Sequence, residues 1–160
     1  MKSLRFAFQL FPIVLCGSLT FFAARMAAQT TAPAAAPVTP GATATLTVSV
    51  TAIRNATGKI RMTLYRDSNP VGSREVEIDP KTLIATVVFD KIPQGTYAVY
   101  LMHDENQNGK LDMDDMGMPL EGYGMSNNPP RREGRPGFDE TNFQIAKPSV
   151  AIEISMIYWQ

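Results

Sequence analysis

Hydrophobic side chains occupy every second position over most of this chain. Between residues 44 and 53, Leu46, Val48 and Val50 alternate with threonine and serine. Successive side chains of a β-strand point to opposite faces, so this alternation predicts a strand with one buried and one exposed face. Further strands are predicted at residues 59–66, 73–78, 83–89, 142–146 and 149–158.

Residues 96–102, TYAVYLM, differ from the other segments because they are apolar on both faces. A strand of this kind is typical of the centre of a sheet. Turn-forming Gly, Pro, Asn and Asp separate the predicted strands, and no segment has a helical period. We therefore expect an all-β fold, a single seven-stranded antiparallel β-sandwich. A long loop rich in Gly, Pro and Asn, residues 117–139, follows its fifth strand.

The first residues of the chain lack this alternation, and their pattern indicates an exported protein. Lys2 and Arg5 precede a mostly apolar run at residues 6–24, and small residues follow it, as in a cleaved export signal. The run is also close to the length of a short membrane span, so an uncleaved anchor is the alternative. We expect a periplasmic or extracellular location, with membrane contact only through an uncleaved signal. The expected boundaries are 1–28 for the signal, 29–41 for a Pro/Ala/Thr linker and 42–160 for the β-sandwich domain.

Charge and cysteine content narrow the possible partners. The chain has 15 basic and 15 acidic residues, and loss of Lys2, Arg5 and Arg25 with the signal leaves 12 basic residues and a net charge of −3. No basic stripe recommends a nucleic-acid partner. The single cysteine, Cys16, also lies in the signal, so the exported domain is expected to fold without disulfides.

A polar loop with the spacing of a calcium-binding loop follows the predicted central strand. Oxygen-bearing side chains lie at alternate positions, and Gly109 then allows the sharp turn that such a loop needs. Because a strand precedes this loop, we expect a structural calcium clamp rather than a helical sensor. The expected ligands are the side chains of Asp104, Asn106, Asn108, Asp112 and Asp115 and the backbone carbonyl of Lys110.

Calcium is the expected cofactor because a cage of protein oxygens suits this large, flexibly coordinated ion better than magnesium. Zinc does not fit a chain with one histidine and no cysteine outside the signal. The charge count predicts a Kd on the order of 10⁻⁵ to 10⁻³ M. The alternative is a solvated turn, since Asp, Asn and Gly are also ordinary turn residues. Against it, six acidic residues between Asp104 and Glu121 would repel one another around the single Lys110.

Two longer segments resemble a known family. The segments GTYAVYLMHDENQNGKLD, at residues 95–112, and GMPLEGYGMSNN, at residues 117–128, resemble the bacterial secreted family called domain of unknown function 2141. The resemblance spans about residues 46–158. It implies a small exported β-sandwich, similar to transthyretin-like or carboxypeptidase-regulatory-like modules, and it implies no activity. The family pattern is often apolar at the position of Asp115, which makes Glu121 the other candidate for closing the metal site.

Two further groups of residues could have a function. His103 adjoins the acidic cluster and would serve a hydrolase as its base, although no motif supplies a nucleophile. We expect it instead to point away from Asp104 and to hydrogen-bond the loop at residues 117–128. The segment after residue 121 could bind a sugar or a peptide, or could simply fold over the calcium loop with Tyr123 as its anchor. The expected ligand-binding residues there are Tyr123, Ser126, Asn127, Arg131 and Arg132.

These patterns together favour an exported, non-catalytic binding or structural module of the cell envelope, with calcium as cofactor and an envelope protein or a glycan as partner. The nine methionines are scattered and lie mostly on predicted strand faces, so we expect them to fill the core rather than to bind copper.

Overall fold

The computed structural model describes residues 41–131 and 134–159. The predicted signal, the predicted linker up to residue 40 and Arg132 lie outside the described residues. No helix within the described ranges is long and apolar enough to cross a membrane. The elements are β1 (Thr43–Thr51), β2 (Lys59–Arg66), β3 (Asn69–Val76), β4 (Ala85–Pro93), β5 (Gly95–Asp104), β6 (Gly122–Met125), α1 (Phe138–Thr141), β7 (Phe143–Ile145) and β8 (Ser149–Ser155).

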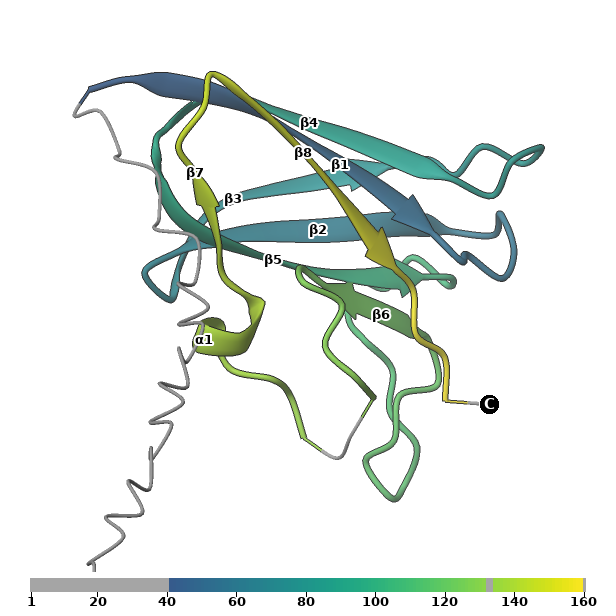
Figure 1. Ribbon diagram of the computed structural model, residues 1–160. Coiled ribbons are helices and arrows are strands. Elements are labelled where there is room, and N and C mark those ends of the chain that lie inside the picture. Colours follow the sequence, from purple (N-terminus) through teal and green to yellow (C-terminus); the bar gives the residue numbers. More distant parts are fainter. Residues whose placement is uncertain (1–40, 132–133, 160) are drawn as a thin grey trace, which may run out of the picture. The chain divides into compact units, whose positions relative to one another are not determined.

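Two packed sheets form the domain, which confirms the predicted β-sandwich (Figure 1). One sheet has the order β4-β1-β8, and the other has the order β3-β2-β5-β6, with β7 also paired to β5. Strand β5 therefore has partners along both edges, as its apolar sequence predicts. It ends at Asp104, so the central strand of the larger sheet leads directly into the candidate calcium loop.

The strand count and one pairing differ from the prediction. The described residues contain eight strands, because β6 lies in the segment expected to be irregular. This strand has only four residues and two of them are glycines, so its sequence resembles a turn. The pairing of β1 with β8 is parallel, from Thr45 opposite Ser149 to Thr51 opposite Ser155. A partner about a hundred residues away leaves no trace in the local pattern.

Strand β3 also begins earlier than predicted. The segment at residues 67–70, which lies between two predicted strands, contains a two-residue hairpin turn. Asp67 and Ser68 have φ angles of 48° and 66°. Positive φ at both central residues fits the type I′ turn, whose twist matches that of paired strands. Pairing with β2 therefore resumes directly at Asn69.

The core lies between the two sheets and follows the predicted alternation. Leu46, Val48 and Val50 of β1 are fully buried, and they face the buried side of β2, including Ile60 and Leu64. Burial of each such side chain stabilises the fold by about 1.5–3 kcal/mol.

The opposite face of the larger sheet positions the candidate site. Arg61, Thr63 and Tyr65 of β2 alternate with the buried residues of that strand and so point away from the core. Tyr100 and Met102 of β5 lie on the same outer face, opposite Thr63 and Arg61 in the strand register. The chain between β5 and β6 and the chain before α1 both border this face.

Candidate functional site

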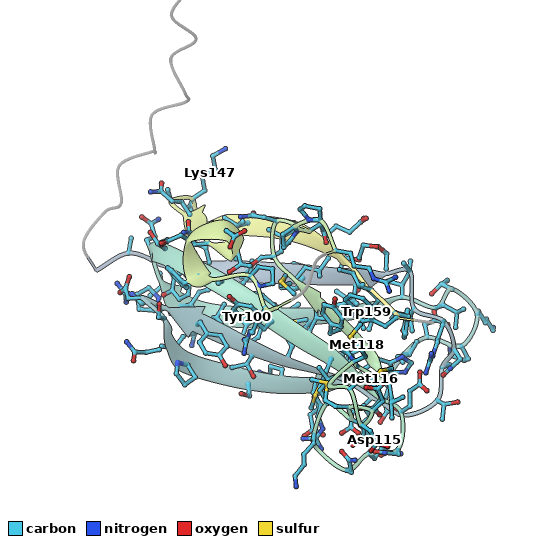
Figure 2. The ribbon with its side chains drawn as sticks, turned by 90° about the horizontal axis from the view of Figure 1, so that it is seen from below. Tyr100, Asp115, Met116, Met118, Lys147 and Trp159 are labelled. Carbon is cyan, nitrogen blue, oxygen red and sulfur yellow. The ribbon has the colours of Figure 1, made fainter. Side chains whose placement is uncertain are left out.

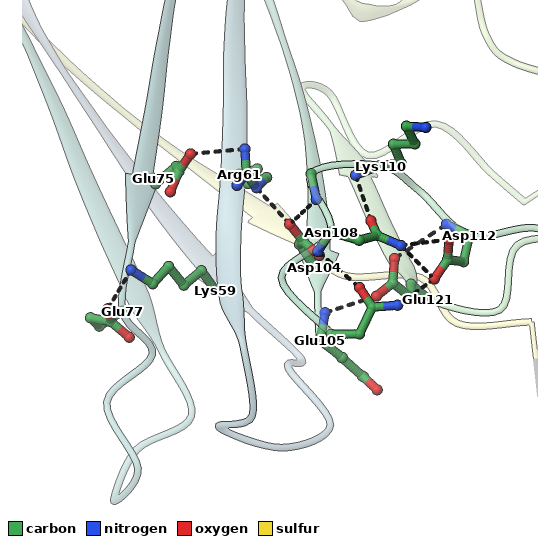
Figure 3. Close-up of polar contacts among 12 residues, drawn as sticks. Lys59, Arg61, Glu75, Glu77, Asp104, Glu105, Asn108, Lys110, Asp112 and Glu121 are labelled. Atoms are coloured by element: carbon green, nitrogen blue, oxygen red, sulfur yellow. Dashed lines mark hydrogen bonds and ion pairs between the residues drawn. The ribbon is translucent and has the colours of Figure 1, made fainter.

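The loop that follows β5 is built around the carboxylate of Asp104, which is fully buried. Its Oδ2 accepts hydrogen bonds from Nε of Arg61 at 2.6 Å and from the backbone N–H of Gly109 at 2.9 Å. Its Oδ1 accepts a hydrogen bond from the backbone N–H of Asn108 at 3.0 Å (Figure 3). A buried charge is costly unless it is paired and hydrogen-bonded, and Asp104 meets both conditions. It therefore fixes the turn at its own end of the loop.

Gly109 permits the turn, as predicted. Its φ angle is +80°, in the left-handed region that side chains disfavour. Its backbone faces the guanidinium of Arg61, which an added Cβ would meet at 3.6 Å. Arg61 also forms an ion pair with Glu75 of β3 at 2.8 Å. The start of the loop is therefore fastened to β2, and through Arg61 also to β3.

The remaining predicted ligands of the first half of the loop gather around Asp112. The side-chain amide of Asn108 donates to both carboxylate oxygens of Asp112, at 2.9 and 3.0 Å, and the amide of Asn106 donates to Oδ2. Meanwhile Oδ1 of Asn106 accepts from the backbone of Asn108, and Oδ1 of Asn108 accepts from the backbone of Lys110. One connected hydrogen-bond network therefore includes Asp104, Asn106, Asn108 and Asp112. Lys110 contributes its backbone N–H to this network.

The chemistry of this donor set suits a hard cation. Carboxylate and amide oxygens are the ligands that Ca²⁺ takes, and a carbonyl oxygen that accepts one hydrogen bond keeps a second lone pair. The two amide N–H groups on Asp112 supply partial positive charge where an ion would supply a full one. Only two carboxylates contribute, however, and within the described residues no three His, Cys, Asp or Glu side chains are grouped as metal ligands. The site therefore depends on its asparagines.

The two acids predicted to close the metal site lie in different places. Glu121 is 4% exposed, and its carboxylate accepts from the backbone N–H of Glu105 at 2.8 Å and of Asp112 at 3.2 Å. It thus joins the beginning, the middle and the end of the loop. Asp115 is exposed and lies at the far end of the loop (Figure 2), and in the described structure it makes no hydrogen bond to the other predicted ligands.

Arg54 fastens the base of the loop from outside, a contact that sequence reasoning missed. Its guanidinium binds the Glu105 carboxylate through two bonds of 2.6 and 2.9 Å and donates to the carbonyl of Leu120 at 3.3 Å. The hydrogen bond from Arg54 lowers the pKa of Glu105, and the same bond raises the pKa of Arg54. These partners are 51 and 66 residues away along the chain, and no local pattern indicates such a pair.

His103 is fully buried and lies on the opposite face of β5 from Asp104, as predicted. The predicted partner in residues 117–128 is wrong. Its Nε2 lies 2.6 Å from the carbonyl oxygen of Thr57, and its Nδ1 lies 2.9 Å from the hydroxyl of Tyr158. A carbonyl can only accept, so Nε2 donates to Thr57, while Nδ1 also lies 3.4 Å from the Glu105 carboxylate. Both ring nitrogens are thus engaged inside the fold.

The segment expected to bind a ligand largely supports the fold. The hydroxyl of Ser126 accepts from the backbone N–H of Val99 at 2.9 Å and donates to the carbonyl of Thr141. The side-chain amide of Asn127 donates to the carbonyls of Glu140 and Asn142, at 3.2 and 2.7 Å. These bonds attach residues 126–127 to the chain around α1.

Tyr123 and Arg131 meet the end of the chain. The hydroxyl of Tyr123 accepts a hydrogen bond of 2.8 Å from Nε1 of Trp159. The guanidinium of Arg131 lies 3.7 Å from the centre of the Trp159 ring, at stacking distance. The aromatic rings of Tyr123 and Trp159 thus lie together at one side of the outer sheet face.

A groove of about 800 Å³ lies over this face, between the sheet, the loop at residues 111–119 and the chain at residues 134–136. Figure 2 shows Met116 and Met118 of the loop near Trp159. The expectation that methionine fills the core is wrong for much of the described chain. The lining includes the rings of Tyr65, Tyr100, Tyr123 and Trp159 and the side chains of Met102, Met113, Met116, Met118 and Met125.

Comparison with known proteins identifies a family but no activity. The model of the family described as "Uncharacterized protein conserved in bacteria (DUF2141)" matches residues 48–153 of this chain. The match includes the whole loop from Asp104 to Glu121 and the sheet beneath the groove. No curated protein and no solved structure matches.

Proposed function

The chain belongs to DUF2141, a family of uncharacterized bacterial proteins, and we propose that it is an exported, non-catalytic binding module whose loop at residues 104–121 binds Ca²⁺. The observation that carries this proposal is the shared network of Asp104, Asn106, Asn108 and Asp112. The network brings together four side chains whose carboxylate and amide oxygens are ligands of the kind that a hard cation takes.

The ion would be held by the side-chain oxygens of these four residues and by the backbone carbonyl of Lys110. Glu121 would close the site in preference to Asp115, because its carboxylate already contacts the backbone at both Glu105 and Asp112. When bound, Ca²⁺ supplies positive charge that balances the acidic loop. Since it binds only the folded loop, it also stabilises the domain by mass action.

The role of the ion would be to fix one wall of the groove. Residues 111–119 form that wall, and they are held near their start by Asp112 and just beyond their end by Glu121, which are joined by a hydrogen bond. A groove whose wall is held by an ion presents a defined surface to a partner in the cell envelope. Hydrolysis through His103 has no support, because both of its ring nitrogens are engaged.

Calcium titration with two matched variants tests the proposal. Asp112→Asn and Asp115→Asn each remove one negative charge from the same loop, but only Asp112 belongs to the network. We expect millimolar Ca²⁺ to raise the Tm of the wild type and of Asp115→Asn, and to have little effect on Asp112→Asn. Calorimetry should give a Kd on the order of 10⁻⁵ to 10⁻³ M. The absence of a Tm shift in the wild type, or an equal loss in both variants, would overturn the proposal.

A further inference from the structure

The groove over the outer sheet face has a lining that the calcium proposal does not explain. Exposed faces of antiparallel sheets are ordinarily polar. Here Met113 and Met116 of the loop, which line the groove, are 50% and 84% exposed. Contiguous exposed apolar side chains mark a surface that binds something.

Within the described residues, the charged side chains of the groove lining are those of Arg61 and Arg135, and none is acidic, although the exported domain is expected to be acidic. Arg61 is neutralised by Asp104 and Glu75. Arg135 forms no ion pair with a carboxylate of the described residues, and its guanidinium lies 3.8 Å from the centre of the Tyr100 ring. Among the residues that the structure describes, Arg135 is therefore the positive charge of the groove that has no carboxylate partner, and it lies against an aromatic ring.

The remaining lining indicates the shape of the occupant. Methionine side chains are unbranched and flexible, and they adapt to apolar partners that have no fixed shape. Five methionines line this groove, three of them on the loop wall (Met113, Met116 and Met118) and two on the sheet (Met102 and Met125). A volume of about 800 Å³ is within the range of small-ligand sites. The polar groups of Thr63, Tyr100, Tyr123 and Trp159 in the lining already have hydrogen-bond partners, which leaves few to recognise a sugar.

We propose that this groove binds a long-chain carboxylate, with the apolar chain along the methionines and aromatic rings and the carboxylate at Arg135. The two parts of the ligand match the two parts of the lining. Arginine is suited to this role because its planar guanidinium can donate two parallel hydrogen bonds to a carboxylate while it stacks on a ring. The proposal is independent of whether the loop binds Ca²⁺.

The chain carries its own reporter for the test. Trp159 is the single tryptophan of the sequence, and it lines the groove. Its fluorescence can be followed while the full chain is titrated with dodecanoate or dodecyltrimethylammonium below the micellar concentration, or with dodecanol below its solubility limit. EDTA in the buffer prevents calcium soaps and separates this experiment from the calcium titration. We expect a saturable change with dodecanoate at about tenfold lower concentration than with dodecanol.

Two arginine variants decide whether the charge is responsible. Arg135→Gln should raise the dodecanoate Kd about tenfold and leave the dodecanol Kd unchanged. Arg74→Gln is the matched control, because Arg74 also lies over an aromatic ring, that of Phe89, but does not line the groove. It should leave both constants unchanged. Equal binding of the cationic amphiphile, or an Arg135→Gln variant that keeps its preference for dodecanoate, would overturn the proposal.

Discussion

Arg61 and Asp104 connect the groove to the loop: Nε of Arg61, in the groove lining, donates at 2.6 Å to the buried carboxylate of Asp104. The two residues are 43 positions apart and lie on neighbouring strands, β2 and β5. The Asp104 side chain is fully buried and that of Arg61 is 32% exposed, so the pair is partly shielded from water. A change in the loop that displaces Asp104 would therefore also displace Arg61, which lines the groove.

Arg61→Gln should destabilise the domain by about 2–3 kcal/mol, because it leaves the Asp104 carboxylate buried without its cation. Urea unfolding measures the loss. Millimolar Ca²⁺ should restore part of it if the ion binds Asp104. Lys59→Gln is the control, since Lys59 lies on the same strand as Arg61 and forms an exposed ion pair with Glu77. Its substitution should cost less than about 0.5 kcal/mol. Equal effects of the two substitutions would contradict this assignment.

Glu105→Gln should lower stability at neutral pH and have no effect in acid. The pKa of Glu105 lies below its ordinary value because Arg54 binds the carboxylate. A lowered pKa contributes stability above the pKa of the unfolded chain, and that contribution is lost as the pH falls through the folded-state value. We expect a difference of about 1 kcal/mol at pH 7, since the pair is partly exposed.

Urea unfolding of the wild type and Glu105→Gln between pH 7 and pH 3 measures this dependence. The two stabilities should converge as the pH falls. The control is Glu77→Gln, because the Glu77 side chain is 75% exposed and its pair should contribute little. A gap between wild type and Glu105→Gln that persists unchanged in acid would rule out the ion pair as its cause.

Tyr158→Phe should cost about 1–2 kcal/mol at pH 7 because it removes the hydrogen bond to the buried His103. Burial raises the pKa of Tyr158, so its contribution is complete below the ordinary phenol value and is lost as the pH rises through the folded-state value. The stability difference between the wild type and the variant should therefore shrink above about pH 10.

Chemical denaturation at pH 7 and at pH 10.5 measures both effects of Tyr158→Phe. Tyr65→Phe serves as the control, because the Tyr65 hydroxyl has no hydrogen bond within the described residues. It should change stability by less than about 0.5 kcal/mol. A loss of stability in Tyr65→Phe as large as that in Tyr158→Phe would show that the hydrogen bond to His103 is not the cause.

Gly122→Ala should destabilise the domain by about 1–3 kcal/mol, because the new methyl group would overpack the core. A Cβ at this position would lie 2.3 Å from the Tyr158 ring and 2.8 Å from Met156. Gly137→Ala is the matched substitution, since a Cβ there meets nothing within 4 Å. Thermal unfolding should show a clear fall in Tm for the first variant and almost none for the second.

The sequence predicts those parts of the molecule that depend on neighbouring residues. The alternation of Leu46, Val48 and Val50 gives the buried face of β1, and the two apolar faces of residues 96–102 give the central place of β5. The spacing of Asp104, Asn106 and Asn108 likewise brings these side chains into one network. In each instance a local backbone geometry, the pleat or the turn, determines the outcome.

The remaining features depend on contacts between distant residues. The bond of Arg54 to Glu105 forms because the chain before β2 and the chain after β5 lie at the same end of the sandwich. The methionines of the groove look like core residues in the sequence, since nothing local tells which side of a loop will be covered. Strand β6 can pair with β5 because Gly122 has no side chain and so leaves room for the ring of Tyr158.

The parallel pairing of β1 with β8 orients the whole domain. The chain enters at Thr43, next to Pro93 and the turn before β5, while β5 runs away from that turn to Asp104. Ten residues of strand span about 30 Å. Strand β8 runs in the same direction as β1, so the C-terminal Trp159 also arrives at the distant end. A partner that binds at the loop would thus approach the domain from the end opposite to the one at which the chain enters β1.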